Sequence, residues 1–115
     1  WERIRTRPVG RIAWADSDGI NVIPVNYTVD EHEIVLRTSP YSALGLACTD
    51  REVAFQVDEI DETRHAGWSV LLHGRCQREE RAGEGPSPWA TGRRVLGLRI
   101  DVRSVTGRHL MAAED

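Results

Sequence analysis

The residues best suited to chemistry lie together at Arg37-Thr38-Ser39, with a further hydroxyl at Ser42. Arg37 ends a run with the alternation of a strand, and Ser39-Pro40 is typical of a helix start, because serine caps the first turn and proline suits its first position. The first amides of a helix attract anions, and an arginine fork matches phosphate oxygens. The pattern therefore predicts a phosphate-binding junction, although a capped helix beside a surface arginine would have the same sequence.

The other side chains that could do chemistry are scattered. Histidines and cysteines show no ligand spacing, so we predict no metal site. Asp58 and Glu59 stand where a strand passes into an acidic stretch, which favours a solvated strand end over a proton-transferring pair. Trp68 is suited to stack on a planar ligand, to fill a subunit interface or to pack in the core. No catalytic acid, base or nucleophile is identified.

These residues must be positioned by a domain that is mainly β. Most of the sequence alternates apolar and polar residues with period two, and short turn signals separate the first runs. Residues 39–50 are predicted to form the one main helix, after the third strand. The acidic residues 58–62 are expected to lead into a loop, 79–93 to be a loose stretch without a helix, and Thr106-Gly107 to be a turn. We predict a single domain over residues 1–115, a six- to seven-stranded antiparallel β-barrel. The expected strands are 9–15, 20–29, 33–38, 53–58, 68–77, 96–103 and a short last one through Met111.

Composition excludes several classes of function. All 15 basic residues are arginine, so no lysine is present for Schiff-base chemistry or a Walker A phosphate loop. The formal net charge of −3 argues against a nucleic-acid-binding module, which normally has a basic excess. The apolar runs are too short to cross a membrane, no signal peptide is visible, and the two cysteines show no disulfide framework. We therefore expect a cytoplasmic protein with reduced thiols.

Four segments of the chain, in this order and spacing, resemble a known family. Together they are similar to the small bacterial members of the pyridoxamine 5′-phosphate oxidase-like family, which are flavin-binding split-barrel proteins. The resemblance implies a mainly β fold of the FMN-binding split-barrel type, in which two subunits pair and each FMN lies in a cleft between the barrels. The segments are VIPVNYTV (22–29), IVLRTSP (34–40), VAFQVDEI (53–60) and GWSVLLHG (67–74).

The resemblance also implies three groups of cofactor-binding residues. One group lines the isoalloxazine ring, one holds the ribityl phosphate, and one reaches the flavin from across the subunit interface. In that order they are Pro24, Val25 and Asn26; Arg37, Thr38 and Ser39, with the Ser42 hydroxyl beside them; and Trp68 and Ser69.

One position departs from the family pattern. Relatives commonly carry a lysine in the first helical turn, where this chain has Ala43. A charged hydrogen bond contributes about 1.5–3 kcal/mol, so we expect weaker FMN binding without that lysine. The chain also lacks the basic residues with which true pyridoxamine phosphate oxidases hold their substrate, which argues against vitamin B6 oxidation.

These inferences favour a homodimeric, FMN-dependent oxidoreductase that acts on a small molecule, with substrate and electron donor unidentified. The flavin would carry the redox chemistry, and the protein would bind and orient it. Two alternatives stay open on the same fold. One is a reductase that uses the deazaflavin F420, and the other is a non-catalytic dimer that binds a flavin or haem.

Overall fold

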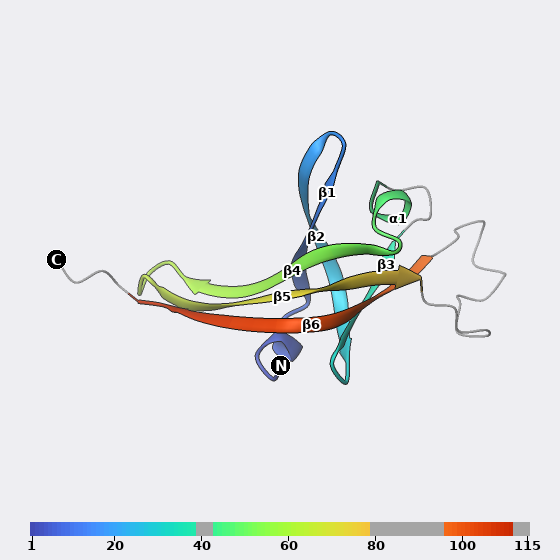
Figure 1. Cartoon of the computed structure of the whole chain (residues 1–115). Coiled ribbons are helices and arrows are strands. Elements are labelled where there is room, and N and C mark those ends of the chain that lie inside the picture. Colours follow the sequence, from blue (N-terminus) through green and yellow to red (C-terminus); the bar gives the residue numbers. More distant parts are fainter. Residues whose placement is uncertain (39–42, 79–95, 112–115) are drawn as a thin grey trace, which may run out of the picture.

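The computed structural model describes residues 1–38, 43–78 and 96–111 (Figure 1). Six antiparallel strands follow one another around the sheet in the order β1-β2-β3-β6-β5-β4, and β4 pairs again with β1, so the sheet closes into a ring. A 3₁₀ turn, η1, precedes the first strand, and a short helix, α1, follows the third. The elements are η1 Ile4–Thr6, β1 Val9–Asp16, β2 Gly19–Asp30, β3 Glu33–Thr38, α1 Ala43–Ala47, β4 Arg51–Asp61, β5 Ala66–Arg78 and β6 Leu96–Leu110.

The alternation of residues decides which face of each strand enters the ring. In β2 the side chains at positions 23, 25, 27 and 29 pack on the core, whereas those at 22, 24, 26 and 28 are exposed, as a period of two predicts. Inside the ring, Tyr27 meets Phe55 edge to face, with 5.0 Å between the ring centroids. Phe55, Ile12 and Leu72 are fully buried there. Because side chains fill the interior, a ligand site must lie on the outer surface or between copies of the chain.

Three strands continue beyond the ring and form an arm. β4 has no partner on β1 after Gln56, and β6 has none on β3 after Asp101, but both stay paired with β5. Figure 1 shows the three strands running side by side away from the crossing strands of the ring. The arm consists of residues 57–61, 66–70 and 102–110.

The arm overturns two expectations from the sequence. The strand that was expected to end near Asp58 continues to Asp61, and Thr106-Gly107 lies inside β6 and not in a turn. Thr106 pairs with Leu71 and Gly107 with Val70. Cross-strand pairing with β5 outweighs the local preference of these residues for turns. One long β6 therefore replaces the two last predicted strands, and the described part of the chain forms six strands.

A close backbone contact marks the place where β5 and β6 leave the ring. The register of the pair shifts between His73 and Gly74. A Cβ atom on Gly74 would lie 2.2 Å from the carbonyl oxygen of Asp101, which is the last residue of β6 paired with β3. Glycine is required because two backbones approach each other here.

The helix lies where the sequence predicted it, but it is short. Within the described ranges only five residues, Ala43–Ala47, form an α-helix. Leu44 and Cys48 are buried beneath it. The chain then turns at Asp50, which has a φ of 60° and whose N–H donates to the Cys76 carbonyl at 2.7 Å, so β4 begins at Arg51. The predicted start of the helix at residues 39–42 and the predicted loop at 79–93 lie outside the described residues.

Neither helical element among the described residues is long and apolar enough to cross a membrane.

Candidate functional site

A shallow hollow lies on the outer face of β2 and β3. Its volume is about 220 Å³, and Asn26, Thr28, Val35 and Arg37 line it together with Tyr27. The register explains this grouping, because Thr28 lies opposite Val35 and Tyr27 lies opposite Leu36. The structure thus brings together Asn26 and Arg37, which the sequence had placed in separate segments of one site. We name this the Arg37 hollow.

The guanidinium group of Arg37 is open to an incoming anion. Its side chain is exposed at the end of β3, where Arg37 pairs with Gly97. None of the residues in the described ranges forms an ion pair or side-chain hydrogen bond with it. By contrast, the Arg99 side chain on the neighbouring strand is only 15% exposed and contacts Asp30 at 2.9 Å. Arg37 is therefore suited to bind a phosphate or carboxylate.

Two other predicted residues of β2 divide between the faces of the strand. Pro24 is exposed on the same face as Asn26 and lies opposite Arg11 of β1. Val25 turns the other way and packs against the core, so its side chain does not reach the outer surface. The proline is tolerated because the described pairing of β2 with β3 ends at Tyr27, which leaves Pro24 without a β3 partner.

The predicted phosphate junction is only partly described. Thr38 ends β3, is half-buried and lies opposite Leu96. Ser39 and Ser42 lie outside the described residues. Ala43, which stands where relatives carry a lysine, is the first residue of α1. A helix of a single turn adds little dipole, so the argument for an anion rests on the Arg37 side chain.

Trp68 and Ser69 lie on opposite faces of β5. Trp68 packs partly on the core, and the guanidinium carbon of Arg3 lies 5.7 Å from the centre of its ring. Ser69 faces outward into a separate hollow of about 380 Å³ on the arm, between Asp58 of β4 and Arg108 of β6. Neither residue lines the Arg37 hollow.

The strand order keeps the two hollows apart in a single chain. Asn26 pairs with Val9 of β1, and Ser69 pairs with Asp58 of β4. Since β1 and β4 stand between β2 and β5, Asn26 and Ser69 are three interstrand spacings of about 4.8 Å apart along the sheet. Within one chain, Asn26 and Ser69 therefore do not face the same isoalloxazine ring.

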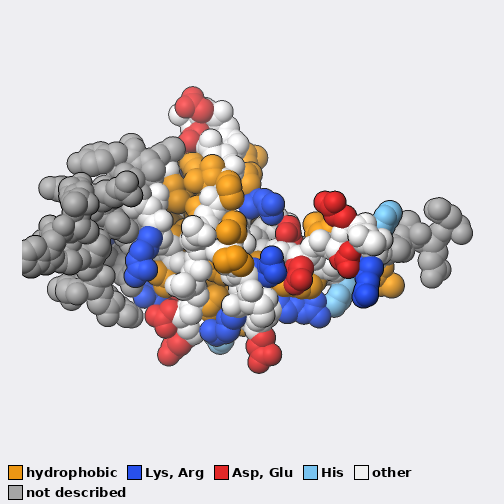
Figure 2. Space-filling model, turned by 180° about the vertical axis from the view of Figure 1, so that it is seen from behind, with side chains coloured by type: hydrophobic (Ala, Val, Ile, Leu, Met, Phe, Trp, Pro, Cys, Tyr) orange, Lys and Arg blue, Asp and Glu red, His pale blue; other side chains and the backbone are white. Residues whose placement is uncertain are grey.

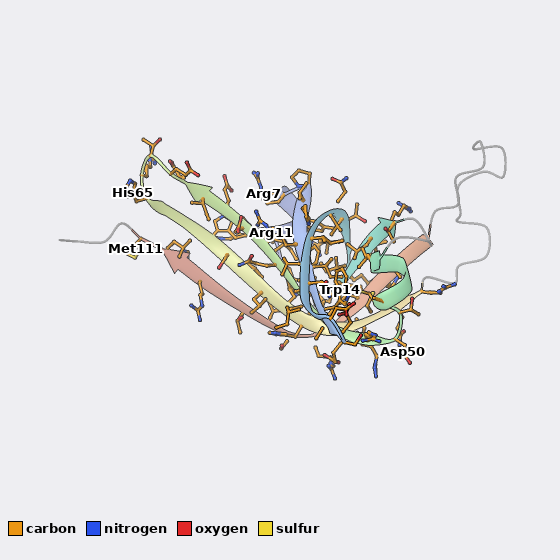
Figure 3. All side chains as sticks on the ribbon, turned by 90° about the horizontal axis from the view of Figure 1, so that it is seen from above. Arg7, Arg11, Trp14, Asp50, His65 and Met111 are labelled. Atoms are coloured by element: carbon orange, nitrogen blue, oxygen red, sulfur yellow. The ribbon has the colours of Figure 1, made fainter. Side chains whose placement is uncertain are left out.

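Arg11 lies on β1, between the strands that carry the two hollows, and was not singled out from the sequence as a site residue. It lies opposite Pro24 on one side and opposite Gln56, which lines the arm hollow, on the other. Its Nη1 contacts the Asp58 carboxylate at 3.2 Å. Figure 3 places Arg7 and Arg11 near the point where the arm leaves the ring. The signal was available, because a charged residue interrupts an otherwise apolar first strand.

The buried titratable groups near the ring are neutral. Burial raises the pKa of the Cys48 thiol to about 11 and that of the Cys76 thiol to about 12. Burial likewise raises the pKa of Tyr27 to about 12. A thiolate is the reactive form of cysteine, so neither thiol is suited to act as a nucleophile. Among the described residues, no group of three His, Cys, Asp or Glu side chains is arranged to hold a metal ion.

Comparison with known proteins settles the family. The profile of the family described as pyridoxamine 5′-phosphate oxidase matches residues 1–109. The chain belongs to this family. The resemblance noted from the four sequence segments is thereby confirmed, and the closed antiparallel sheet is the fold expected for the pyridoxamine 5′-phosphate oxidase family.

Solved structures share the fold of this family member. A FAD-binding protein from Mycobacterium smegmatis superposes with a TM-score of 0.84 at 22% identity, covering 98% of this chain and 94% of that one. A conserved protein of unknown function from Corynebacterium diphtheriae has a TM-score of 0.73 at 28% identity, with 96% and 91% covered. A FAD-binding protein from Mesorhizobium loti has a TM-score of 0.71 at 20% identity, with 94% and 88% covered. The search of curated proteins finds no match.

Proposed function

We propose that this member of the pyridoxamine 5′-phosphate oxidase family binds a flavin nucleotide on the outer face of β2 and β3, with the phosphate next to the ribityl chain on Arg37. The observation that carries the proposal is the exposed Arg37 guanidinium, which has no ionic partner among the described residues and faces a hollow. Two of the similar solved structures are FAD-binding proteins, and FAD contains the FMN unit predicted from the sequence.

The residues of the Arg37 hollow fit the FMN unit of such a cofactor. The Arg37 fork can donate two parallel hydrogen bonds to phosphate oxygens. The Asn26 amide and the Thr28 hydroxyl can each donate to, or accept from, the hydroxyls of the ribityl chain. Pro24, two residues before Asn26, offers an exposed apolar surface that the edge of the isoalloxazine ring could contact. These groups bind and orient the nucleotide without any of them acting as an acid or base.

When bound, a flavin supplies hydride or electron transfer, which leads us to propose an oxidoreductase. The proposed substrate is a small molecule that would reach the isoalloxazine ring from solvent or from the arm hollow. Vitamin B6 oxidation stays disfavoured, because no lysine is present and the described arginines around the Arg37 hollow are few. The physiological electron donor is left to experiment.

We further propose that two copies complete the site. Ser69 was predicted to reach the flavin from across the site, and in one chain it lies in a different hollow from Arg37. A second copy that places its arm over the first copy's β2 and β3 would bring the two hollows together. Exposed apolar side chains on the outer face of the arm, such as Ile60 and Leu110, support this arrangement, because an unpaired chain would leave them in water.

Arg37→Ala tests the proposed site directly. We expect FMN-unit affinity to fall about tenfold or more, because the substitution removes a charge-assisted contact with the phosphate. Titration of the purified chain with flavin, followed by quenching of flavin fluorescence, measures this loss. Arg64→Ala is the matched control, since its side chain is 83% exposed in the turn at the tip of the arm. Equal affinities for Arg37→Ala and the unmodified chain would exclude Arg37 from the site.

The spectrum of the purified protein separates the proposal from its alternatives. A bound oxidised flavin shows two visible bands, a deazaflavin shows one, and haem shows an intense Soret band. A flavin spectrum combined with turnover of a reduced nicotinamide donor would support an oxidoreductase. Flavin binding without turnover of any donor would instead favour a carrier or sensor, and Ala43 in place of the family's lysine is consistent with that outcome.

A further inference from the structure

The arm hollow, which contains Ser69, is large enough to hold a small ligand by itself. Its volume of about 380 Å³ lies within the range of roughly 300–1,000 Å³ that is ordinary for small-molecule sites. The Arg37 hollow, at about 220 Å³, is smaller than that range. Because β4, β5 and β6 of one chain form the arm hollow, a ligand could bind there without a flavin.

The outer end of the arm hollow is apolar. Ile60 of β4 and Leu110 of β6 both lie opposite Gly67 of β5, so a residue without a side chain separates two large aliphatic ones. Both aliphatic side chains line the hollow, and they are 54% and 41% exposed. Leu71 adds apolar surface at the inner end, closer to the closed part of the sheet. This arrangement is suited to a compact apolar group held between β4 and β6.

One positive charge in the arm hollow has no partner in the described part of the chain. Asp58 and Arg108 lie opposite Ser69 from either side, two residues closer to the closed part of the sheet than the apolar pair. The Asp58 carboxylate is already paired with Arg11, at 3.2 Å. The Arg108 guanidinium forms no ion pair or hydrogen bond with any residue of the described ranges. The charge of Arg108 is therefore available to an anionic ligand.

The assembly proposed above makes an anion necessary here. If the arm of one copy lies over β2 and β3 of the other, Arg108 is removed from water. Burial of a guanidinium group without a counter-charge is unfavourable. No acidic residue of the described ranges lines the Arg37 hollow, which would face the arm. A small anion bound between the copies would supply the missing charge.

We infer that the arm hollow binds a small monocarboxylate with an apolar body, and that the substrate of the proposed oxidoreductase belongs to this class. The second part of the inference rests on the flavin site proposed above. The carboxylate accepts two parallel hydrogen bonds from the Arg108 fork, and the apolar body packs between Ile60 and Leu110. One arginine balances a monoanion, whereas a phosphate monoester would keep an excess of negative charge beside aliphatic side chains.

The spacing of the two parts agrees with a ligand of this size. Two residues of a strand span about 7 Å, which separates the level of Arg108 from that of Leu110. This distance is comparable with the length of a benzoate ion, so benzoate is a suitable probe.

Titration of the full chain without added flavin, followed by ligand-observed NMR, tests the binding site. Benzoate carries the aromatic ring and the charge, benzamide the ring alone and acetate the charge alone. We expect benzoate to bind about tenfold more tightly than either of the others, because only benzoate uses both parts of the hollow. Arg108→Gln should bind benzoate and benzamide equally. Arg64→Gln, a substitution of an exposed arginine at the tip of the arm, should keep the preference for benzoate.

Titration with FMN separates a carboxylate site from a second contact with the flavin phosphate. Arg108→Gln should keep the FMN affinity of the unmodified chain, whereas Arg37→Ala should lose it. Equal losses in the two variants would place Arg108 on the phosphate and overturn the inference. A preference for benzoate that survives in Arg108→Gln, or that is absent from the unmodified chain, would overturn it as well. Thermal unfolding checks that each variant is folded.

The absorption spectrum of the flavin-loaded chain tests the link to the substrate. Benzoate should shift the visible bands of bound FMN, because the proposed assembly brings the arm hollow to the flavin. Benzoate binding with an unchanged spectrum would overturn the role as substrate site. FMN binding without any preference for benzoate would overturn this inference alone. Failure to bind FMN, with the preference for benzoate intact, would overturn the proposed function and leave the arm hollow as a carboxylate site.

Discussion

At the scale of single residues, the surroundings of each arginine decide what it can do. Arg99 is held between Asp30 at 2.9 Å and Glu33 at 3.4 Å and is mostly buried, so its role is to join β2, β3 and β6. Arg11 is paired with Asp58 at 3.2 Å. Arg37 has no such partner among the described residues and lines a hollow. Sequence spacing alone does not separate these cases, because the carboxylates that pair with an arginine come from distant strands.

Tyr27→Phe tests whether the N-terminal segment depends on a single hydroxyl. The substitution leaves the buried Ile4 carbonyl without its donor, so we expect the free energy of unfolding to fall by about 1–2 kcal/mol. Urea denaturation measures the change. Thr6→Val is the control, because it removes a hydroxyl that donates to the exposed Arg3 carbonyl at 2.6 Å and should cost less than about 0.5 kcal/mol. Equal losses in the two variants would contradict the role given to burial.

The buried thiols predict how stability responds to alkaline pH. Their pKa values are raised from 9.0 to about 11 for Cys48 and about 12 for Cys76, so the folded state favours the neutral thiols. The unfolded chain ionises first, and the free energy of unfolding should therefore fall as pH rises above about 9. Cys76→Ala should make this decline shallower. Urea denaturation at a series of pH values checks it, and an unchanged slope would show that Cys76 does not contribute.

At the scale of elements, the sequence predicted the strands of the ring better than those of the arm. The prediction of which side chains of β2 face the core was correct, because one side of that strand packs on the core and the alternation of residues then decides the face. The end of β4 was predicted too early, near Asp58, and Thr106-Gly107 was wrongly predicted as a turn, because long-range pairing with β5 extends both strands. Asn26 and Arg37, which line one hollow, were predicted as site residues from local pattern and family resemblance, and their role stays a prediction. Arg11 was not singled out from the sequence, because Asp58, with which it forms an ion pair, comes from a distant strand.

Gly74 allows β5 and β6 to pass closely where they leave the ring. Gly74→Ala would place a Cβ 2.2 Å from the Asp101 carbonyl oxygen, so we expect a loss of about 1–3 kcal/mol in the free energy of unfolding. Gly107→Ala is the matched control in the neighbouring strand, where the nearest contact of an added Cβ is 3.9 Å. That variant should be neutral or slightly more stable. A larger loss at Gly107 than at Gly74 would refute the close approach.

At the scale of the whole molecule, the ring and the arm carry different features. The ring carries the packed core and the Arg37 hollow, and the arm carries the hollow that contains Ser69. In the view of Figure 2, apolar side chains gather over the ring, whereas acidic and basic side chains are spread along the arm. Under the proposed assembly, the site would be complete only when the arm of a second chain reaches the ring of the first.

Leu110→Glu tests this proposed assembly. Leu110 is 41% exposed and lines the arm hollow, so a carboxylate there should disrupt contact with a second chain. We expect the mass in solution to shift from two chains to one and flavin affinity to fall with it. Analytical ultracentrifugation measures the mass, and flavin titration measures the affinity.

Val105→Glu provides the control for Leu110→Glu. Val105 lies on the same strand with the same 41% exposure, but it does not line the arm hollow. This variant should keep the mass and flavin affinity of the unmodified chain. A single chain in solution before any substitution would contradict the proposed assembly.

The burial of both thiols makes site-specific labelling of the protein possible. Both cysteines of the chain, Cys48 and Cys76, are fully buried and protonated, so maleimide reagents should leave the native protein unlabelled. A His65→Cys variant would then carry one reactive handle at the end of the arm, where Figure 3 places His65. Spin labels attached there would report, by dipolar spectroscopy, how far apart the two tips lie when copies associate.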